Sequence, residues 1–140
     1  MPRRKSPAKR RGKKSLAAKA DLHALYERSV QDPETDADTL ARLYRRFRGK
    51  DAKVLREDFC GSALLACAWV RHRGHHEATG VDLDPDPLAW GREHNLSQLT
   101  DGQRARVRLV EGNVLDVRGR PADVIAAFNF SYSVFQKRRK

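Results

Sequence analysis

Short apolar segments alternate with helix-like segments from residue 53 onward, and this order limits the folds open to the chain. The segment at 62–72 is apolar on nearly every side and ends in basic residues and a glycine, as helices do. Four segments have the composition of β-strands: 53–57, 78–83, 106–110 and 122–128. Strands that alternate with helices predict a parallel α/β sheet whose strands are buried on both faces.

Two further helices are predicted ahead of the first strand. Apolar residues recur at helical spacing over 22–30 and again over 40–47. Asp36 or Asp38 can cap the start of the second helix, and Gly49 suits its C-terminal cap. The predicted domain therefore begins with a pair of helices and continues into the sheet.

Basic residues are concentrated at the two ends of the chain. The 140 residues carry a formal net charge of +11, yet residues 1–20 alone hold nine Lys or Arg, and 137–140 are all basic. The first 19 residues contain almost no large apolar side chains, so they are predicted to be disordered. We therefore divide the chain into a disordered basic tail at 1–19, a domain at 20–136 and a basic C-terminal end at 137–140.

The basic tail leaves two interpretations open. Lys and Arg can neutralise phosphates in a salt-dependent way that does not depend on sequence, which predicts non-specific nucleic-acid binding through residues 1–19. The alternative is a solvated tail with no selected partner. No aromatic residue lies among the charges, so stacking on bases is not indicated.

Several classes of protein are excluded by what the sequence lacks. No segment approaches the ~18 apolar residues that span a bilayer, and the basic N-terminus has no apolar stretch typical of a secretory signal. These observations predict a cytoplasmic protein without a membrane partner. Cys60 and Cys67 form no CxxC pair and are predicted to be reduced packing thiols. The histidines of RHRGHHE, at 71–77, lack the further ligands of a metal site, so a solvated helix end and no metal are predicted.

Polar residues follow each of the four predicted strands. Glu57 ends the first strand, and Gly61 lies in the next loop, where a residue without Cβ lets backbone approach a ligand. Asp82 closes the second strand, about 20 residues further along the sequence. This is the separation expected of a carboxylate that accepts hydrogen bonds from ribose hydroxyls. Asn113 and Asn129 follow the third and fourth strands. Because ligands of open parallel sheets bind beyond the carboxyl ends of the strands, these residues predict a binding site there.

Four segments at these strand ends also resemble a known family. They are LREDFCGSA, GVDLDPDPLAWG, VRLVEGNVLDV and ADVIAAFNFSY, in this order. Together they resemble the first four motifs of the class I (Rossmann-like) S-adenosylmethionine-dependent methyltransferases, over roughly residues 20–135. The resemblance implies a Rossmann-like parallel sheet, incomplete at about four strands where the family has seven. We interpret the chain as the N-terminal, cofactor-binding part of such an enzyme, truncated after the fourth strand. The strand left at the edge predicts self-association or a partner.

The resemblance implies roles in binding S-adenosylmethionine. Glu57 would lie near the amino-acid end of the cofactor, with Cys60 as a small residue close by and Gly61 passing beneath it. Asp82 would bind the ribose hydroxyls, and Leu83 would lie beside the adenine.

The third and fourth motifs complete the implied site. Asn113 and Val114 would touch the edge and face of the adenine, and Asn129 would border the methyl-transfer site. Tyr26 and Tyr132 either line the site or pack in the core. No catalytic residue is assigned, and the methyl acceptor is unknown; an amine is one open alternative.

The glycine-rich loop departs from the family pattern. The usual loop has three glycines, but Phe59 and Ala63 stand at the first and third positions. Phe59 argues against a dinucleotide, because a pyrophosphate needs close backbone approach. The alternative to an enzyme is a non-catalytic, nucleic-acid-associated protein that binds through its basic tails.

Overall fold

The computed structural model describes residues 21–30, 32–128 and 131. The predicted tail at 1–19, the basic end at 137–140 and the residues Asn129 and Tyr132 lie outside this range, so their roles stay predictions. Within the described residues, no helix has the length and apolar character needed to cross a membrane.

A four-stranded parallel sheet forms the centre of the molecule, in the order β3-β2-β1-β4. Its strands are β1 (Val54–Asp58), β2 (Glu77–Asp82), β3 (Val107–Glu111) and β4 (Val124–Ala126). All four predicted strands are confirmed. The register pairs Asp58 with Val81 and Asp82 with Glu111, so the carboxyl ends of β1, β2 and β3 meet at one edge.

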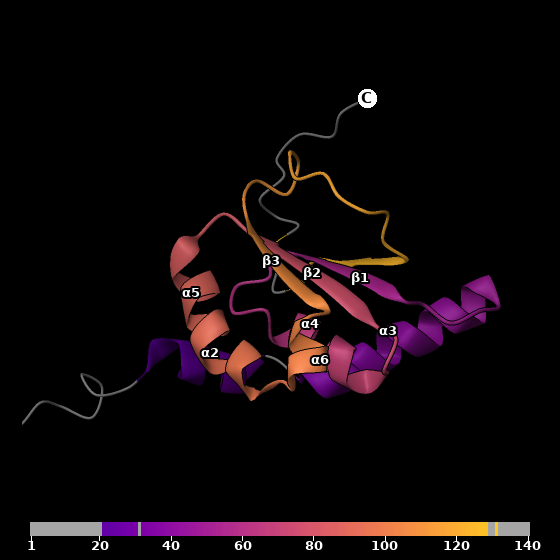
Figure 1. The fold of residues 1–140 in the computed structure, drawn as a ribbon, viewed down its shortest axis with the longest axis horizontal. Coiled ribbons are helices and arrows are strands. Elements are labelled where there is room, and N and C mark those ends of the chain that lie inside the picture. The colour runs from indigo at the N-terminus through magenta and orange to yellow at the C-terminus, as the bar shows by residue number, and fades with distance from the viewer. Residues whose placement is uncertain (1–20, 31, 129–130, 132–140) are drawn as a thin grey trace, which may run out of the picture.

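The helices lie on one side of this sheet, as Figure 1 shows. Apolar side chains of β1, β2 and the central helix form the core, among them Leu55, Ala78, Leu65 and Trp69, all 3% exposed or less. The helices are α2 (Leu22–Val30), α3 (Pro33–Arg48), α4 (Leu64–His72), α5 (Pro85–His94) and α6 (Asp101–Arg104), with a 3-10 turn at Leu96–Gln98.

The prediction that the strands are buried on both faces is wrong for part of the sheet: Val54 and Val81 are buried on the face opposite the core, but other residues of that face are not. Side chains alternate across a strand, and the residues that pair with one another, Arg56, Thr79 and Arg108, lie on the face opposite the core. Ile125, in register with Arg56, is 64% exposed. Of the described segments, only the connection between β3 and β4 passes over this face, on the side of the sheet away from the helices in Figure 1. We call it the open face.

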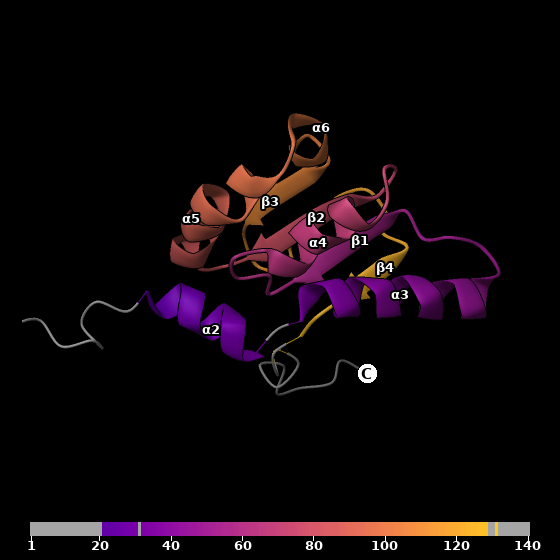
Figure 2. The ribbon, with the colours of Figure 1, turned by 90° about the horizontal axis from the view of Figure 1, so that it is seen from below.

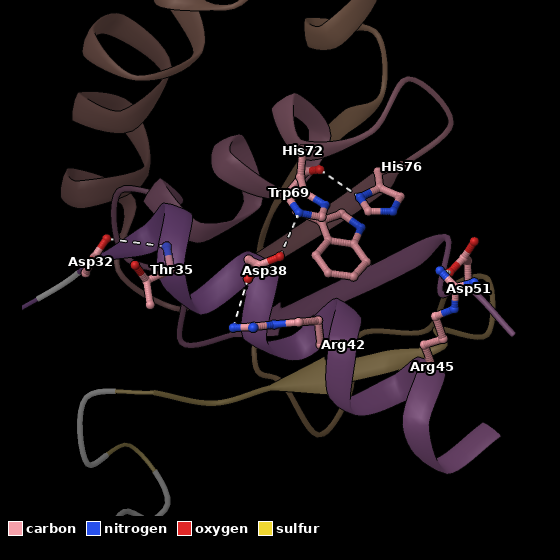
Figure 3. Close-up of polar contacts among 9 residues, drawn as sticks. All are labelled: Asp32, Thr35, Asp38, Arg42, Arg45, Asp51, Trp69, His72 and His76. Atoms are coloured by element: carbon pink, nitrogen blue, oxygen red, sulfur yellow. Dashed lines mark hydrogen bonds and ion pairs between the residues drawn. The ribbon is translucent and has the colours of Figure 1, made fainter. Parts of the chain in front are cut away.

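Asp32 caps α3, not Asp36 or Asp38 as predicted. Its side chain accepts a hydrogen bond from the backbone of Thr35, and a proline follows at the first helical position. Asp38 instead pairs with Arg42 at 2.9 Å and with His72 of α4 at 3.4 Å, which Figure 3 shows. The predicted cap at the other end is confirmed.

The histidines after α4 are not all solvated, contrary to prediction. His76 is only 2% exposed, its ring stacks on Trp69 with centroids 4.2 Å apart, and its Nδ1 hydrogen-bonds to the Trp69 carbonyl (Figure 3). Burial lowers the pKa of His76 to about 4, so the ring stays neutral.

The described residues contain no group of side chains suited to a metal ion. Cys60 and Cys67 are free and buried, as predicted.

Asp123 joins the last strand to the first. Its carboxylate accepts the backbone N–H groups of Lys53 and Val54 at 2.8 and 2.9 Å, and the Tyr44 hydroxyl at 3.1 Å. One side chain thus fixes α3, the start of β1 and the start of β4.

The far edge of β4, where Ile125 is exposed, is free of strand pairing within the described chain. Self-association at this edge stays a prediction.

Candidate functional site

A cavity of about 280 Å³ lies at the carboxyl edge of the sheet. Figure 2 shows α2 beside the ends at which the strands point. The lining comes from α2, from the loop after β1, from the end of β2 and from the residues after β4: His23, Tyr26, Glu27, Phe59, Cys60, Gly61, Ser62, Asp82, Pro87, Phe128 and Ser131. We call it the carboxyl-edge cavity. Of the predicted site residues, it brings together Cys60, Gly61 and Asp82.

In the loop after β1, every second residue has a positive φ, a conformation that favours glycine, and this occurs at three positions. Phe59, Gly61 and Ala63 have φ values of 59°, 53° and 60°, all in the left-handed region. These are the three positions at which the methyltransferase pattern has glycine. The chain thus keeps the turn while replacing two glycines with residues for which the conformation is unfavourable, by roughly 1–2 kcal/mol each.

Asp82 holds this turn against the end of β2. One carboxylate oxygen accepts the N–H of Gly61 at 2.7 Å, and the other accepts the N–H of Asp84 at 3.0 Å. The backbone carbonyl of Asp82 accepts the N–H of Gly112 at 2.8 Å, which places the third strand's end alongside. Each carboxylate oxygen keeps a further lone pair with which to accept a hydrogen bond from a ligand.

The start of α4 is fixed from below by Glu57. This side chain is 3% exposed, and it accepts the N–H of Ala66, one of the free donors in the first turn of α4, at 3.0 Å. Burial raises the pKa of Glu57 to about 8. Glu57 does not line the cavity: it supports the turn from beneath.

Helix α5 approaches the turn closely because it has glycine at the contact. A Cβ at Gly91 would lie 2.3 Å from the carbonyl oxygen of Ser62. That carbonyl accepts a hydrogen bond from the Asn95 side chain at 3.0 Å. The Asn95 amide also donates to Glu27 of α2 at 2.7 Å, and the Ser62 hydroxyl donates to the same carboxylate oxygen.

Helix α2 closes one side of the cavity and is tied to α5 at its own start. The indole N–H of Trp90 donates to Asp21 at 3.0 Å, and the rings of His23 and Trp90 lie 5.5 Å apart. The face of α2 that carries Leu22, Leu25 and Tyr26 is between 49% and 76% exposed, so the apolar spacing that predicts the helix does not mark its buried side. Tyr26 lines the cavity, which was one of its two predicted places.

The remaining predicted residues lie outside the cavity lining. Leu83 is 69% exposed just past β2. The side-chain oxygen of Asn113 accepts the N–H of Leu115 at 2.9 Å, which leaves its amide hydrogens as donors. The carbonyl oxygen of Val114 accepts a hydrogen bond from the guanidinium of Arg56 at 2.6 Å. The contact between Asp82 and Gly112 places these residues next to the cavity, not in it.

The charge of the lining favours a cation over a pyrophosphate. Two carboxylates line the carboxyl-edge cavity, Glu27 and Asp82, and no Lys or Arg of the described chain does. Cys60 is 3% exposed, and burial raises the pKa of its thiol, so it lines the cavity as a neutral group.

Sequence reasoning missed most of the contributions of α2. His23 and Glu27 were not predicted as site residues, because their spacing marks only a helix. Glu27 meets partners 35 and 68 residues away along the chain, and no local pattern reports such a contact. Phe128 and Ser131 carried a weak signal, since both flank the predicted Asn129.

No protein-family model and no curated protein matches the chain. Solved structures do. An amino pentose methyltransferase from Micromonospora echinaspora, solved with S-adenosylmethionine bound, has 20% identity and a TM-score of 0.60, with 81% of this chain and 43% of that chain covered. A sugar N-methyltransferase from Streptoalloteichus has 20% identity and a TM-score of 0.62, with 98% and 49% covered.

A plantazolicin methyltransferase in complex with S-adenosylhomocysteine gives a similar result, with 15% identity, a TM-score of 0.58, and 74% of this chain and 38% of that chain covered. The chain thus spans less than half the length of these proteins. The likeness to these structures extends over most of this chain and concerns the fold. The chain has the Rossmann-like α/β fold of S-adenosylmethionine-dependent methyltransferases, represented by part of that fold.

Proposed function

We propose that the chain is the cofactor-binding part of an S-adenosylmethionine-dependent methyltransferase. One observation carries this proposal: Asp82 and the left-handed turn at 59–63 together border a cavity at the carboxyl edge of a Rossmann-like sheet. The structural neighbours include proteins solved with S-adenosylmethionine or S-adenosylhomocysteine.

The charges on the lining support this cofactor. S-adenosylmethionine carries a sulfonium and has no pyrophosphate, so the carboxylates of Glu27 and Asp82 favour it and the lack of lining Lys or Arg does not oppose it. A dinucleotide would place two phosphates against these acids. The dinucleotide alternative is therefore disfavoured by side-chain charge as well as by Phe59.

We assign the roles residue by residue. The carboxylate of Asp82 accepts hydrogen bonds from the ribose hydroxyls, while Leu83 lies beside the adenine. The free amide hydrogens of Asn113 meet the adenine edge, and Val114 contacts its face. Gly61 and Cys60 pass beneath the amino-acid end of the ligand. Glu57 acts indirectly, by holding the turn. The role proposed for Asn129 falls outside the described residues.

Methyl transfer mainly requires that the methyl donor and the acceptor are held in the right relative position. The cofactor supplies an activated methyl group, and this chain's residues hold it and shield it from water, which raises the effective concentration of the reacting pair. The acceptor and the group that deprotonates it are not assigned.

Titration of the full chain with S-adenosylhomocysteine by calorimetry tests the proposal. We expect saturable binding to the wild type and a loss of roughly tenfold or more in Asp82→Asn, because a hydrogen bond to a charged group contributes about 1.5–3 kcal/mol. Asn keeps an oxygen for the Gly61 N–H, so the turn can persist. Asp51→Asn is the matched control, since Asp51 is exposed and does not line the carboxyl-edge cavity. No binding by a folded wild type would overturn the cofactor assignment.

A further inference from the structure

The open face of the sheet carries a second cavity, of about 420 Å³. It lies between the strands and the connection from β3 to β4, and it shares no lining residue with the carboxyl-edge cavity. Its charged lining consists of five arginines and one carboxylate: Arg56, Arg106, Arg108, Arg118, Arg120 and Glu77. We call it the arginine cavity. Its lining has a large excess of positive charge.

The register of the sheet places two of these arginines in one row. Arg56 of β1 pairs with Thr79 of β2, which pairs with Arg108 of β3. Neighbouring strands lie about 4.8 Å apart, so the two arginine backbones are roughly 10 Å apart on the same face. Arg118 and Arg120 come from the connection that passes over this row. Cations thus border the space from the sheet and from the connection.

Three of the five guanidinium groups are already committed. Arg56 bonds to Asp58 and to the carbonyls of Val114 and Val117, and Arg106 bonds to the carbonyls of Val70, Arg73, His76 and Gly102. Arg120 pairs with Glu77 at 2.5 Å. These contacts hold the borders of the cavity in place and neutralise part of its charge.

Arg108 and Arg118 are different. Both are exposed, and neither guanidinium makes a hydrogen bond or ion pair with another described residue. A guanidinium presents its donors in a fixed fork that matches phosphate oxygens. Two such groups face a space whose one lining carboxylate is already paired to Arg120.

The rest of the lining is apolar and of suitable size. Val54, Val117 and Ala122 contribute to it, and the volume falls within the roughly 300–1,000 Å³ of small-molecule sites. Because both the sheet and the connection over it form the walls, the cavity suits a compact ligand better than a continuous polymer strand. An apolar body with an anionic end matches the surface.

We propose that the arginine cavity binds a small organic phosphate of nucleotide size, with Arg108 and Arg118 contacting the phosphate. The ligand's uncharged part lies against the apolar wall. This site is separate from the proposed cofactor site, so its occupation does not depend on binding there.

Calorimetric titration of the full chain with metal-free ADP tests the proposal. We expect saturable binding, and a loss of about tenfold or more when Arg108→Gln and Arg118→Gln are combined. The control combines Arg46→Gln with Arg92→Gln, two exposed arginines on α3 and α5 that line neither cavity; it removes the same charge and should leave the affinity within about twofold. Circular dichroism melting shows whether each variant is folded, and Arg108→Lys, which keeps the charge, should retain part of the affinity.

Four results would overturn the proposal. They are a folded wild type that does not bind ADP, an equal loss in the control pair, a loss of ADP binding in Asp82→Asn or in saturating S-adenosylhomocysteine, and displacement of ADP by a short oligothymidylate at concentrations well below those of ADP. The third result would place ADP in the carboxyl-edge cavity, and the fourth would assign the surface to nucleic acid. If S-adenosylhomocysteine fails to bind while ADP binds as expected, the proposed function fails and this proposal stands.

Discussion

The two cavities belong to one sheet but differ in charge and in the way they are built. The carboxyl-edge cavity is formed by turns and helix starts, and its side-chain charges are the carboxylates Glu27 and Asp82. The arginine cavity is formed by the sides of strands and by a connection that lies over them, and it has a large excess of guanidinium groups. In the first, backbone geometry shapes the site; in the second, cross-strand register does. Damage to one cavity should therefore leave the other intact.

The largest effect should come from Gly91→Ala, which breaks the carboxyl-edge cavity alone. A new Cβ would lie 2.3 Å from the Ser62 carbonyl oxygen, a backbone atom, so α5 must move away from the turn. We expect a loss of ~3 kcal/mol in the free energy of unfolding, the cost of forced overpacking, measured by urea denaturation. S-adenosylhomocysteine binding should weaken while ADP binding persists. Gly102→Ala adds a Cβ with nothing within 4 Å and is the control. An equal loss in both variants would contradict the close contact.

Stability at alkaline pH should depend on Glu57, beneath the carboxyl-edge cavity. Its pKa is about 8 in the folded chain against an ordinary value of 4.5, so the folded state retains a proton that the unfolded state releases between these values. Raising the pH through this window therefore lowers stability, by on the order of 3 kcal/mol between pH 5 and 8. Glu57→Gln keeps an acceptor for the Ala66 N–H but cannot ionise, and should lose this decline. Urea unfolding from pH 5 to 9 measures it; parallel curves for both proteins would refute the buried proton.

Stability at acid pH should depend on His76, near the other end of the strands. The folded pKa of about 4 lies below the ordinary value of 6.5, so the unfolded state binds the extra proton. Stability is full above pH 6.5 and falls as the pH drops toward 4, by about 3 kcal/mol. His76→Phe retains an aromatic ring against Trp69 and should show a shallower decline. His75→Phe, at an exposed position, is the control and should follow the wild type. Comparing the unfolding free energies of the three proteins from pH 4 to 7 decides the matter.

A smaller effect is expected from Gly61→Ala, which separates backbone strain from crowding. A Cβ at Gly61 would meet nothing within 4 Å, but its φ of +53° is unfavourable for alanine. We expect a loss of about 1 kcal/mol in unfolding free energy. Gly74→Ala also meets nothing and has no positive φ, so it should change stability less. If the two variants were equally stable, the left-handed turn would have no energetic consequence.

The sequence predicted the strands well because their apolar composition and flanking turns are local signals. It failed on the open face, although a signal was present: Arg56 lies between the buried residues Leu55 and Glu57 in β1, and Arg108 is more exposed than Val107 and Leu109 on either side of it in β3. The order of elements suggested burial on both sides, and that inference overrode the alternation. An arginine between two residues that face the core is direct information that the opposite face is polar, because side chains alternate across a strand.

The cap of α3 shows a similar error. Asp32 followed by a proline is a stronger start signal than Asp36 or Asp38, because proline at the first helical position is preorganised for the helix. The candidate site was predictable where its residues lie at strand ends, as for Asp82. It was not predictable where α2 completes it, because Glu27 reaches Ser62 and Asn95 only after the chain has folded.

The contacts of Asp123 also bear on how the chain assembles during synthesis. The backbone N–H groups of Lys53 and Val54 donate to a carboxylate that lies 70 and 69 residues further along the chain, so this contact forms only after Asp123 has been synthesised. At ~5–20 residues per second, a ribosome needs roughly 4 to 14 seconds to supply it. In the folded sheet β1 is an interior strand, but during that interval the edge that later pairs with β4 is unpaired. A nascent chain held at that length offers this edge to any strand that reaches it first, so the closing of β4 sets the end of the period in which mispairing can occur.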